Sequence, residues 1–452
     1  MYIKKLQLLN YRNYKYLDIS LGKKVNVFMG DNAQGKTNIL EAIYYCAFAK
    51  SHRTSRDKEL INWKADRAYL SLLVGRERLD KNIDISILKD GKKAIKINKV
   101  KVSKIGELFG NFNVVMFSPE DLKIIKNSPG VRRKFIDMEL CQLNQKYYYN
   151  LVQYNKVLIE RNLLLKNRNL DKEMLDIYDI QLAEFGHNII IERLNYINKL
   201  NFYGEEIHRD ISSGKEIIKF KYISTVKELG DIKKNFYEAL VKNRDKDIEK
   251  GITTIGPHRD DFTVLINEID AKSFGSQGQQ RSAVLTIKFS SLKIIKEITS
   301  EYPVLLLDDV LSELDFSRKR YVLTSIQDIQ TIITCTGIED LTNYLDNSSK
   351  VFKVKDGEIL WWGRNFMFLH LGENVVVPIK DIIGIFDLNT TMYSSDTSSF
   401  LRMAEEDGFV ERISKEHQPK SFVIAEVNKK SKIFLSPISS STLTKRANLD
   451  YN

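Results

Sequence analysis

The fold of this chain is decided by the stretch Gly30-Asp31-Asn32-Ala33-Gln34-Gly35-Lys36-Thr37. It matches G-x-x-x-x-G-K-S/T in full, follows an apolar run over residues 25–29 and precedes a helical pattern over residues 38–45. In this motif glycines let backbone N–H groups surround phosphates, and the helix N-terminus adds positive potential. We expect all eight residues to bind ATP, with Lys36 on the β and γ oxygens and Thr37 on Mg²⁺.

A second part of such a site follows far along the chain. The run Pro303-Val304-Leu305-Leu306-Leu307 predicts a buried strand that ends in Asp308 and Asp309. Asp308 is expected to hold Mg²⁺, usually through water, and Asp309 to orient or deprotonate the attacking water. Alone, the run would indicate only an ordinary buried strand with a polar end. Combined with the phosphate loop, it predicts one ATP site whose two halves are separated by an insertion.

The insertion differs from the rest of the chain in amino-acid composition. Residues 131–245 are charged, rich in Leu, Ile and Tyr and poor in Gly and Pro, with apolar spacings of three and four. This pattern predicts helices, and its heptads are too short and irregular for a long coiled coil. We therefore expect a compact helical subdomain inserted into an α/β part. The strands expected before it cover residues 2–9, 25–29, 69–74, 83–88 and 114–117.

A third element is Phe274-Gly275-Ser276-Gln277-Gly278-Gln279-Gln280-Arg281, which leads into a helical pattern over residues 282–298. Alone, such a string could be a turn and a helix cap. Its place shortly before the two aspartates gives it more weight. Leu311-Ser312-Glu313-Leu314-Asp315 follows them. In this order the four elements resemble the Walker A, signature, Walker B and D-loop of ABC-type ATPases.

The version with a helical insert and no transporter signals is similar to the RecF family, compact relatives of the SMC proteins. Further strings typical of that family are Asn10-Tyr11-Arg12-Asn13-Tyr14, Ser51-His52-Arg53-Thr54, Phe117-Ser118-Pro119-Glu120-Asp121-Leu122 and Gly256-Pro257-His258-Arg259-Asp260-Asp261. The resemblance covers residues 1 to about 360. A transporter ATPase subunit is disfavoured, because the places of the transporter Q-loop glutamine and histidine are taken by residues 117–121 and 333–336.

The resemblance implies a dimer with two ATP molecules between its protomers. Ser276, Gly278 and Gln279 of one protomer would cap the γ-phosphate on the Walker A loop of the other, with Ser312 and Asp315 in the D-loop. A helix N-terminus expected at Ser282 suits an anion that arrives from outside. Hydrolysis would weaken the dimer. Many ABC ATPases carry Glu in place of Asp309, so we expect slow turnover.

Charge supports a polyanionic partner. Of 452 residues, 70 are basic and 59 acidic, and the net charge of +11 lies entirely before residue 364, since residues 364–452 are neutral. Basic residues between 123 and 172 are interleaved with tyrosines, which fits phosphate contacts or a solvated helix face. We expect a DNA-stimulated ATPase whose homodimer binds single- and double-stranded DNA without sequence preference. The resemblance implies RecR and RecO as partners, with RecA loading at single-strand/double-strand junctions in gap repair and the SOS response.

The sequence leaves two possible roles open for each of two residues, His258 and Arg53. His258 fits a structural hydrogen-bonding role, or a place near the nucleotide or between the insert and the head. Arg53 either reaches nucleotide or DNA, or faces solvent. The cysteines, Cys46, Cys141 and Cys335, are odd in number and widely spaced, which favours reduced thiols in a cytoplasmic protein. No apolar run approaches the length of a membrane span.

The C-terminal part predicts a small β-rich domain. It has a β pattern over residues 375–386, a short helix over 399–407 and a Ser/Thr-rich tail. The strings Phe368-Leu369-His370-Leu371-Gly372 and Phe422-Val423-Ile424 resemble the RemB/YaaB-type family related to RemA, and Met367 lies where such a protein would start. We interpret this as a fused domain for self-association or regulation, or as a passive appendage. An alternative function is DNA organisation or transcriptional regulation through this domain. The expected domains are 1–125 and 249–360 (ATPase head), 126–248 (arm) and 366–452.

Overall fold

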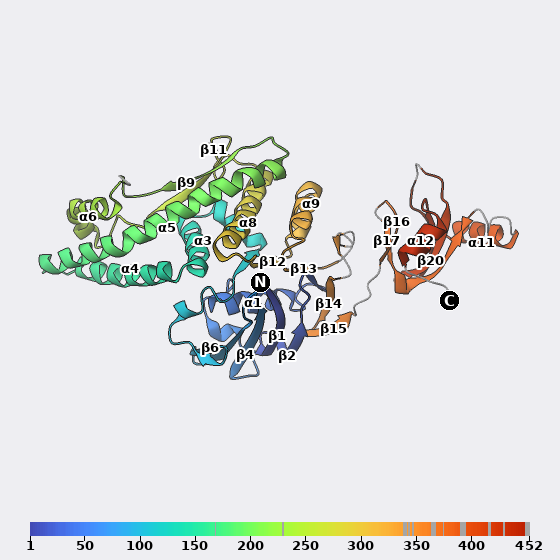
Figure 1. The fold of residues 1–452 in the computed structure, drawn as a ribbon, viewed down its shortest axis with the longest axis horizontal. Coiled ribbons are helices and arrows are strands. Elements are labelled where there is room, and N and C mark those ends of the chain that lie inside the picture. Colours follow the sequence, from blue (N-terminus) through green and yellow to red (C-terminus); the bar gives the residue numbers. More distant parts are fainter. Residues whose placement is uncertain are drawn as a thin grey trace. The chain divides into compact units, whose positions relative to one another are not determined.

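The computed structural model describes residues 1–167, 169–227, 230–337, 341, 344–345, 348–362, 368–373, 375–388, 395–414, 417–427 and 430–447. The chain forms two compact units (Figure 1). The first contains residues 1–336 and 352–360, and the second contains residues 337–351 and 361–452.

The core of the first unit is a six-stranded sheet in the order β15-β14-β3-β13-β12-β8. Its strands β3, β13, β12 and β8 are parallel and mostly apolar, as is typical of parallel sheets. This sheet joins strands from both ends of the unit, because β3 and β8 precede the insertion and the other four follow it. The strands are β3 (Val25–Met29), β8 (Val114–Phe117), β12 (Val304–Asp308), β13 (Thr331–Cys335), β14 (Lys350–Lys355) and β15 (Glu358–Trp362).

A second, antiparallel sheet has the order β2-β1-β4-β5-β6-β7. The expected strands 2–9, 69–74 and 83–88 are confirmed and extended by one or two residues at their ends. Helix α1 (Lys36–Phe48) contacts strands of both sheets. The strands are β1 (Tyr2–Tyr11), β2 (Tyr14–Ser20), β4 (Arg67–Gly75), β5 (Lys81–Leu88), β6 (Lys93–Ile97) and β7 (Val100–Lys101), and short 3-10 turns cover η1 (Asp57–Leu60), η2 (Ile105–Glu107) and η3 (Pro119–Leu122).

The insertion is an arm of helices that run side by side (Figure 1). It consists of α2 (Lys123–Lys126), α3 (Pro129–Leu143), α4 (Gln145–Leu164), α5 (Lys172–Ser212), α6 (Ile232–Lys242) and α7 (Arg244–Lys250). The expectation of helices alone was wrong at β9 (Ile218–Ile223), which pairs with β10 (Asp261–Ile266), itself paired with β11 (Ile269–Asp270). Residues 218–222 alternate buried and less buried positions, a period of two that favours a strand.

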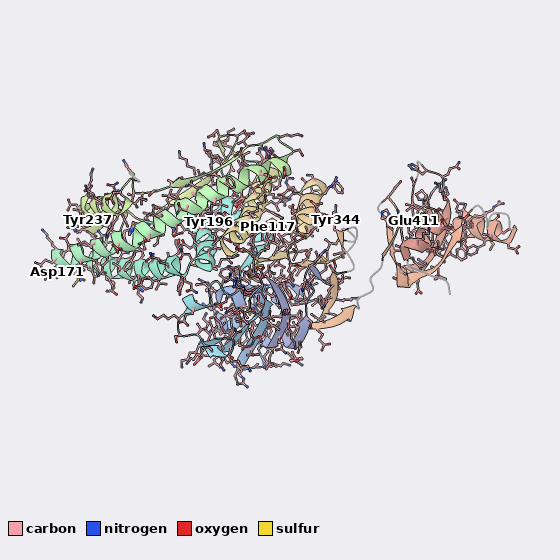
Figure 2. All side chains as sticks on the ribbon, in the orientation of Figure 1. Phe117, Asp171, Tyr196, Tyr237, Tyr344 and Glu411 are labelled. Carbon is pink, nitrogen blue, oxygen red and sulfur yellow. The ribbon has the colours of Figure 1, made fainter. Side chains whose placement is uncertain are left out.

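Buried ion pairs hold the arm helices together. Arg161 on α4 is fully buried and donates to Asp179 at 2.6 Å and to Asp247 at 2.8 Å. A buried charge of this kind needs partners, and removing one partner is strongly destabilising. Figure 2 shows Asp171 at the end of the arm remote from the head, and Tyr196 nearer its base, where its hydroxyl lies 2.8 Å from Ser291 Oγ.

After the arm come α8 (Gln277–Thr299), the turn η4 (Leu311–Glu313) and α9 (Phe316–Ser325). The start of α8 corrects the sequence prediction, because the helix begins at Gln277 and not at Ser282. Ser276 caps it: its Oγ accepts from Gln279 N at 3.2 Å, while Gln279 Oε1 accepts from Ser276 N at 2.9 Å. This reciprocal capping box fixes the helix start at the signature itself.

The second unit is β-rich, as predicted. Two of its strands form one sheet, and four form another in the order β18-β20-β21-β19, around a core that includes Leu371, Val423 and Phe434. In the Ser/Thr-rich tail, residues 440–447 form a helix that buries Leu443 and Ala447. The elements are β16 (Phe368–Gly372), β17 (Val375–Pro378), η6 (Ile379–Asp381), β18 (Ile382–Asp387), α11 (Ser395–Glu406), β19 (Val410–Arg412), β20 (Ser421–Val427), β21 (Lys430–Ser436) and α12 (Ser440–Ala447).

Candidate nucleotide site

The phosphate loop lies between β3 and α1. Gly30 and Gly35 have φ angles of 157° and 113°, and a Cβ on Gly30 would lie 2.3 Å from the carbonyl oxygen of Val354. Glycine is therefore required at Gly35 by its left-handed backbone and at Gly30 by close packing. Lys36 Nζ donates to the carbonyl oxygens of Gly30 at 2.5 Å and Asp31 at 2.8 Å. Its ammonium group thus lies inside the curve of the loop.

Two distant segments hold the loop from outside. Asn13 Nδ2 donates to the Gln34 carbonyl oxygen at 2.9 Å. In the turn between β14 and β15, Asp356 N donates to Gln34 Oε1 at 2.6 Å and Gly357 N donates to the Gln34 carbonyl oxygen at 3.1 Å. Sequence reasoning missed this turn. The Asp-Gly pair signals a tight turn, but nothing in the sequence connects it to a loop more than 300 residues away.

The two aspartates lie at the carboxyl end of β12, next to the start of α1. Thr37 Oγ1 donates to Asp308 Oδ1 at 2.9 Å, although the two residues are 271 positions apart. Thr334 at the end of β13 also donates to Asp308 Oδ1 at 2.9 Å, and its hydroxyl accepts from Asp309 N at 3.0 Å. The predicted Walker A and Walker B residues are thus brought together. Thr334 was known from the sequence only as a departure from the transporter histidine.

Asp309 has an unusual backbone conformation and a raised pKa. It has a left-handed φ of 55°, uncommon for a residue with a side chain. Burial raises its pKa, Asp308 raises it further, and the opposing attraction of Lys36 does not cancel these effects. A carboxyl group with a raised pKa is a better proton acceptor than an ordinary aspartate.

Helix α1 is anchored by a buried carboxylate, Glu41. It accepts from Arg12 at 2.6 and 2.8 Å and from Ser51 Oγ at 2.6 Å. Burial alone would raise the pKa of Glu41, but these hydrogen bonds and the Arg12 charge lower it. Arg53 Nη1 donates to Asn38 Oδ1 at 2.9 Å, which places this partly exposed guanidinium beside the first turn of α1.

His258 has a structural environment. Its Nδ1 lies 2.7 Å from Tyr154 Oη and its Nε2 lies 3.0 Å from the Thr253 carbonyl oxygen. Burial lowers its pKa to about 4, and the positive charges of Arg259 and Arg133 act in the same direction. A neutral imidazole with both nitrogens engaged fits the structural interpretation, in which His258 joins α4 to the segment before β10.

The signature and the D-loop are joined to each other. Arg318 on α9 donates to the Gly278 carbonyl oxygen at 3.0 Å, and its backbone N donates to Asp315 Oδ1 at 2.9 Å. Ser312 Oγ donates to the Asp309 carbonyl oxygen at 2.8 Å. Gln279, the remaining predicted signature residue, donates to Glu216 on the arm at 2.9 Å.

The signature does not meet the phosphate loop of its own chain by hydrogen bonding. Within the described part of the chain, the hydrogen bonds of Ser276, Gly278 and Gln279 stay within α8 or reach the arm and α9. Ser276 is exposed. The apolar rings of Phe274 and Phe316, at the starts of α8 and α9, are 77% and 76% exposed. This part of the surface therefore presents polar donors flanked by uncovered aromatic rings.

No helix among the described residues is long and apolar enough to cross a membrane. A family model described as RecF/RecN/SMC N terminal domain matches residues 2–359. A second model, described as Extracellular matrix regulatory protein A-like, matches residues 368–447, which confirms the predicted RemA-related resemblance.

The curated relatives carry one description. A "DNA replication and repair protein RecF" of Clostridium perfringens (strain 13 / Type A) is 72% identical over 359 residues, covering 79% of this chain and 99% of the relative. One from Clostridium tetani (strain Massachusetts / E88) is 58% identical over 365 residues, covering 80% and 100%. A solved structure of the recombination mediator protein RecF-ATP in the RecFOR pathway superposes with a TM-score of 0.74 at 37% identity, covering 80% of this chain and 98% of its own. This chain therefore belongs to the RecF family, with the ABC-type ATPase fold of that family, and continues into a RemA-like domain.

Proposed function

We propose that this protein is an ATP-switched, DNA-binding ATPase of replication and recombinational repair. The observation that carries the proposal is the 2.9 Å hydrogen bond between Thr37 and Asp308, because it joins the two motifs that a nucleoside triphosphate site requires. The descriptions of the relatives support the DNA function, and the ATP-bound RecF structure supports the nucleotide. The same family membership removes the case for a transporter subunit.

In this proposal residues 30–37 surround the triphosphate, and Lys36 turns from the loop carbonyls to the β and γ oxygens. The oxygens of Thr37 and Asp308 fit Mg²⁺, a hard cation that prefers hydroxyl, carboxylate and water ligands. When bound, Mg²⁺ neutralises developing charge on the phosphates. Asp309 orients the attacking water and accepts its proton, and the raised pKa supports this role. Its short side chain favours slow turnover.

The complete site is proposed to need two protomers. Ser276, Gly278 and Gln279 of the partner would cap the γ-phosphate, since an exposed serine hydroxyl and a helix N-terminus suit an anion on a second molecule. The exposed rings of Phe274 and Phe316 would be covered in the same dimer. Ser312 and Asp315 couple this surface to Asp309. Loss of the γ-phosphate on hydrolysis would release the dimer.

The cellular role is proposed from the family. A cytoplasmic homodimer would bind single- and double-stranded DNA at gaps or junctions, and DNA would stimulate its ATPase activity. RecO and RecR would be its partners in assisting RecA loading and SOS induction. We propose the division into head (1–125 and 249–360), arm (126–248) and C-terminal domain (366–452). Residues 363–367, with the proposed boundary and Met367, lie outside the described residues.

A second candidate function rests on the match to a matrix regulatory family at residues 368–447. In that case the C-terminal domain would act as a DNA organiser or transcriptional regulator, and the head would only dimerise it. The neutral charge of residues 364–452 gives this candidate less support, because the whole excess of basic residues lies in the ATPase part.

The test is an ATPase assay of the full chain with single-stranded, duplex and gapped DNA across a salt series, with sedimentation of the same samples. We expect ATP-dependent dimers and DNA stimulation that falls steeply with salt, because phosphate contacts release counterions. Monomers at saturating ATP would refute the switch. Turnover that no DNA form changes would refute the DNA-stimulated enzyme.

A further inference from the structure

A cavity of about 610 Å³ lies between the head and the base of the arm, apart from the nucleotide loop. Its head side is formed by the end of α1, with Phe48 and Lys50, and by Phe109. Its arm side is formed by α3, with Arg133 and Lys134, and by α4 and α5. The volume is typical of a site for a small ligand or for one unit of a polymer.

The charges around the cavity are not balanced. Lys93 is neutralised by Asp57 at 2.8 Å, and Arg193 is paired with Asp137 at 2.7 Å. Three further lining cations, Lys50, Arg133 and Lys134, have no carboxylate within ion-pairing distance among the described residues. Burial lowers the pKa of Arg133, and the charges of Arg193 and Arg259 lower it further against the opposing effect of Asp261 and Asp137. Its Nη1 donates to the Asp260 carbonyl oxygen at 2.8 Å. The cavity therefore favours an anionic ligand.

The walls are aromatic and apolar. The rings of Phe109 and Tyr148 meet edge to face with their centroids 4.9 Å apart, and the ring centroids of Phe48 and Phe109 are 6.4 Å apart. Tyr148 is only partly buried, and its hydroxyl has no hydrogen-bond partner among the described residues. A flat apolar group can therefore approach this ring without breaking an internal bond.

Tyr148 differs from the tyrosines on either side of it in the sequence. Tyr147 is buried, and its hydroxyl donates to Asp137. Tyr149 is 56% exposed and does not line the cavity. Tyr154 is buried and bonded to His258. The basic residues and tyrosines of this segment therefore belong mainly to the core or to the outer surface. Of these four tyrosines, Tyr148 is the one that is partly exposed and also lines the cavity.

We propose that this cavity holds one unstacked nucleotide of single-stranded DNA, with its phosphate on Lys50, Arg133 and Lys134 and its base against Tyr148 and Phe109. Cationic side chains for the phosphate and aromatic rings for the base are the combination that single-stranded DNA recognition uses. The inference rests on the proposed function, since it specifies where DNA binds. Helix α1 runs from Lys36 in the phosphate loop to Phe48 in the cavity wall, so an occupied cavity contacts the helix that starts at the nucleotide.

The direct test is photocrosslinking of the full chain to a single-stranded thymidine oligonucleotide that carries 5-iododeoxyuridine at one position, followed by peptide mass spectrometry. We expect a crosslink at Tyr148. It should persist at residue 148 in Tyr148→Phe, which keeps the ring, and be lost in Tyr148→Ala. Crosslinks confined to residues outside the cavity, with single-stranded binding intact, would overturn the cavity proposal and leave DNA binding standing.

A second experiment tests the charged residues of the cavity. It replaces only exposed side chains, which are not expected to affect folding. The double variant Lys50→Ala/Lys134→Ala should weaken binding of a thymidine oligonucleotide by about tenfold and lower the magnitude of its salt slope by about 1.4, as expected for two lost phosphate contacts on a single strand. Lys96→Ala, an exposed lysine on β6 that does not line the cavity, is the control and should have at most about a twofold effect. An equal loss of oligonucleotide affinity in the double variant and in Lys96→Ala would overturn the proposal. It would also be overturned if an acidic peptide bound in the cavity and the oligonucleotide did not displace it. Absence of DNA binding in the wild type would instead refute the proposed function.

Discussion

The two halves of the candidate ATP site differ in how complete they are within one chain. On the Walker side, Lys36 and Asp308 are 7% and 8% exposed, and both already have partners from the same protomer. On the signature side, Ser276 is exposed beside the uncovered ring of Phe274. The Walker side, whose side chains are buried and hydrogen-bonded within one protomer, can bind phosphates without a second protomer. The exposed serine at the start of α8 instead needs a ligand that is held by another molecule. Nucleotide binding and dimerisation should therefore be separable by substitution.

The largest effect is expected for Lys36→Ala, on the buried half. Loss of the ammonium removes charge-assisted hydrogen bonds to the triphosphate, and we expect ATP affinity to fall by at least about 100-fold, equivalent to about 3 kcal/mol. The ATP-dependent dimer should disappear with it in sedimentation. Lys64→Ala, an exposed lysine in a loop of the head, is the control. An unchanged dimer in Lys36→Ala would refute the claim that dimerisation depends on bound ATP.

Ser276→Arg should affect the exposed half alone. ATP binding by the monomer should stay within about twofold, because the residue lies outside the Walker side, while dimerisation and hydrolysis should be lost through steric and charge conflict at the interface. Equilibrium binding of a fluorescent ATP analogue and sedimentation measure the two effects separately. Ser103→Arg, at an exposed serine after β7, is the matched control. Normal turnover by Ser276→Arg would refute a shared site.

Asp309→Asn should separate binding from chemistry. We expect hydrolysis to fall by about 100-fold or more, the usual contribution of a general base, and ATP to stay trapped in a long-lived dimer. In the wild type the rate should decline as pH falls through the raised pKa of Asp309, hence at a higher pH than for an ordinary aspartate of pKa 3.8. Single-turnover assays across pH measure both. The control is Asp245→Asn, which should hydrolyse ATP at the wild-type rate. If Asp309→Asn lost ATP as rapidly as this control, the general base would be another residue.

A smaller effect is expected for Gly357→Ala in the turn that holds the phosphate loop. Its φ is 75°, and a Cβ would lie 2.5 Å from the Asn13 carbonyl oxygen, so the turn must shift away from Gln34. We expect ATP affinity to fall by about fivefold to tenfold, equivalent to about 1 kcal/mol. Gly91→Ala has a similar φ of 84° with nothing near its Cβ, so it controls for backbone strain. Equal ATP affinity in both variants would exclude a role for the turn.

The smallest effect is expected for deletion of residues 367–452. The RecF-family match ends at residue 359, and the described core of the second unit is its own, so DNA-stimulated turnover should stay within about twofold. Loss of DNA stimulation on this deletion would favour the alternative in which the C-terminal domain carries the function.

Much of this molecule was predictable because its signals are local. The parallel strands at residues 25–29 and 114–117 are mostly apolar, and the sequence predicted the bounds of both to the residue. The predicted start of α8, at Ser282, lies five residues after the observed start at Gln277, because a capping box resembles a turn until Gln279 is seen to bond back to Ser276. The strand β9 was hidden in a charged, Pro-poor segment, since its partner β10 lies about 40 residues later.

Local sequence was sufficient to identify the phosphate loop, the strand with its terminal aspartates, the family and the boundary of the basic part. Each of these depends on neighbours in the chain, on backbone freedom at glycines and on runs of apolar side chains. The tertiary structure was needed to show that Thr334 and the turn at Asp356 and Gly357 complete the Walker side. It was also needed to show that His258 is a structural residue and that Tyr148 is a partly exposed residue of the cavity wall. Those facts depend on pairings over tens to hundreds of residues, which packing sets and local sequence does not encode.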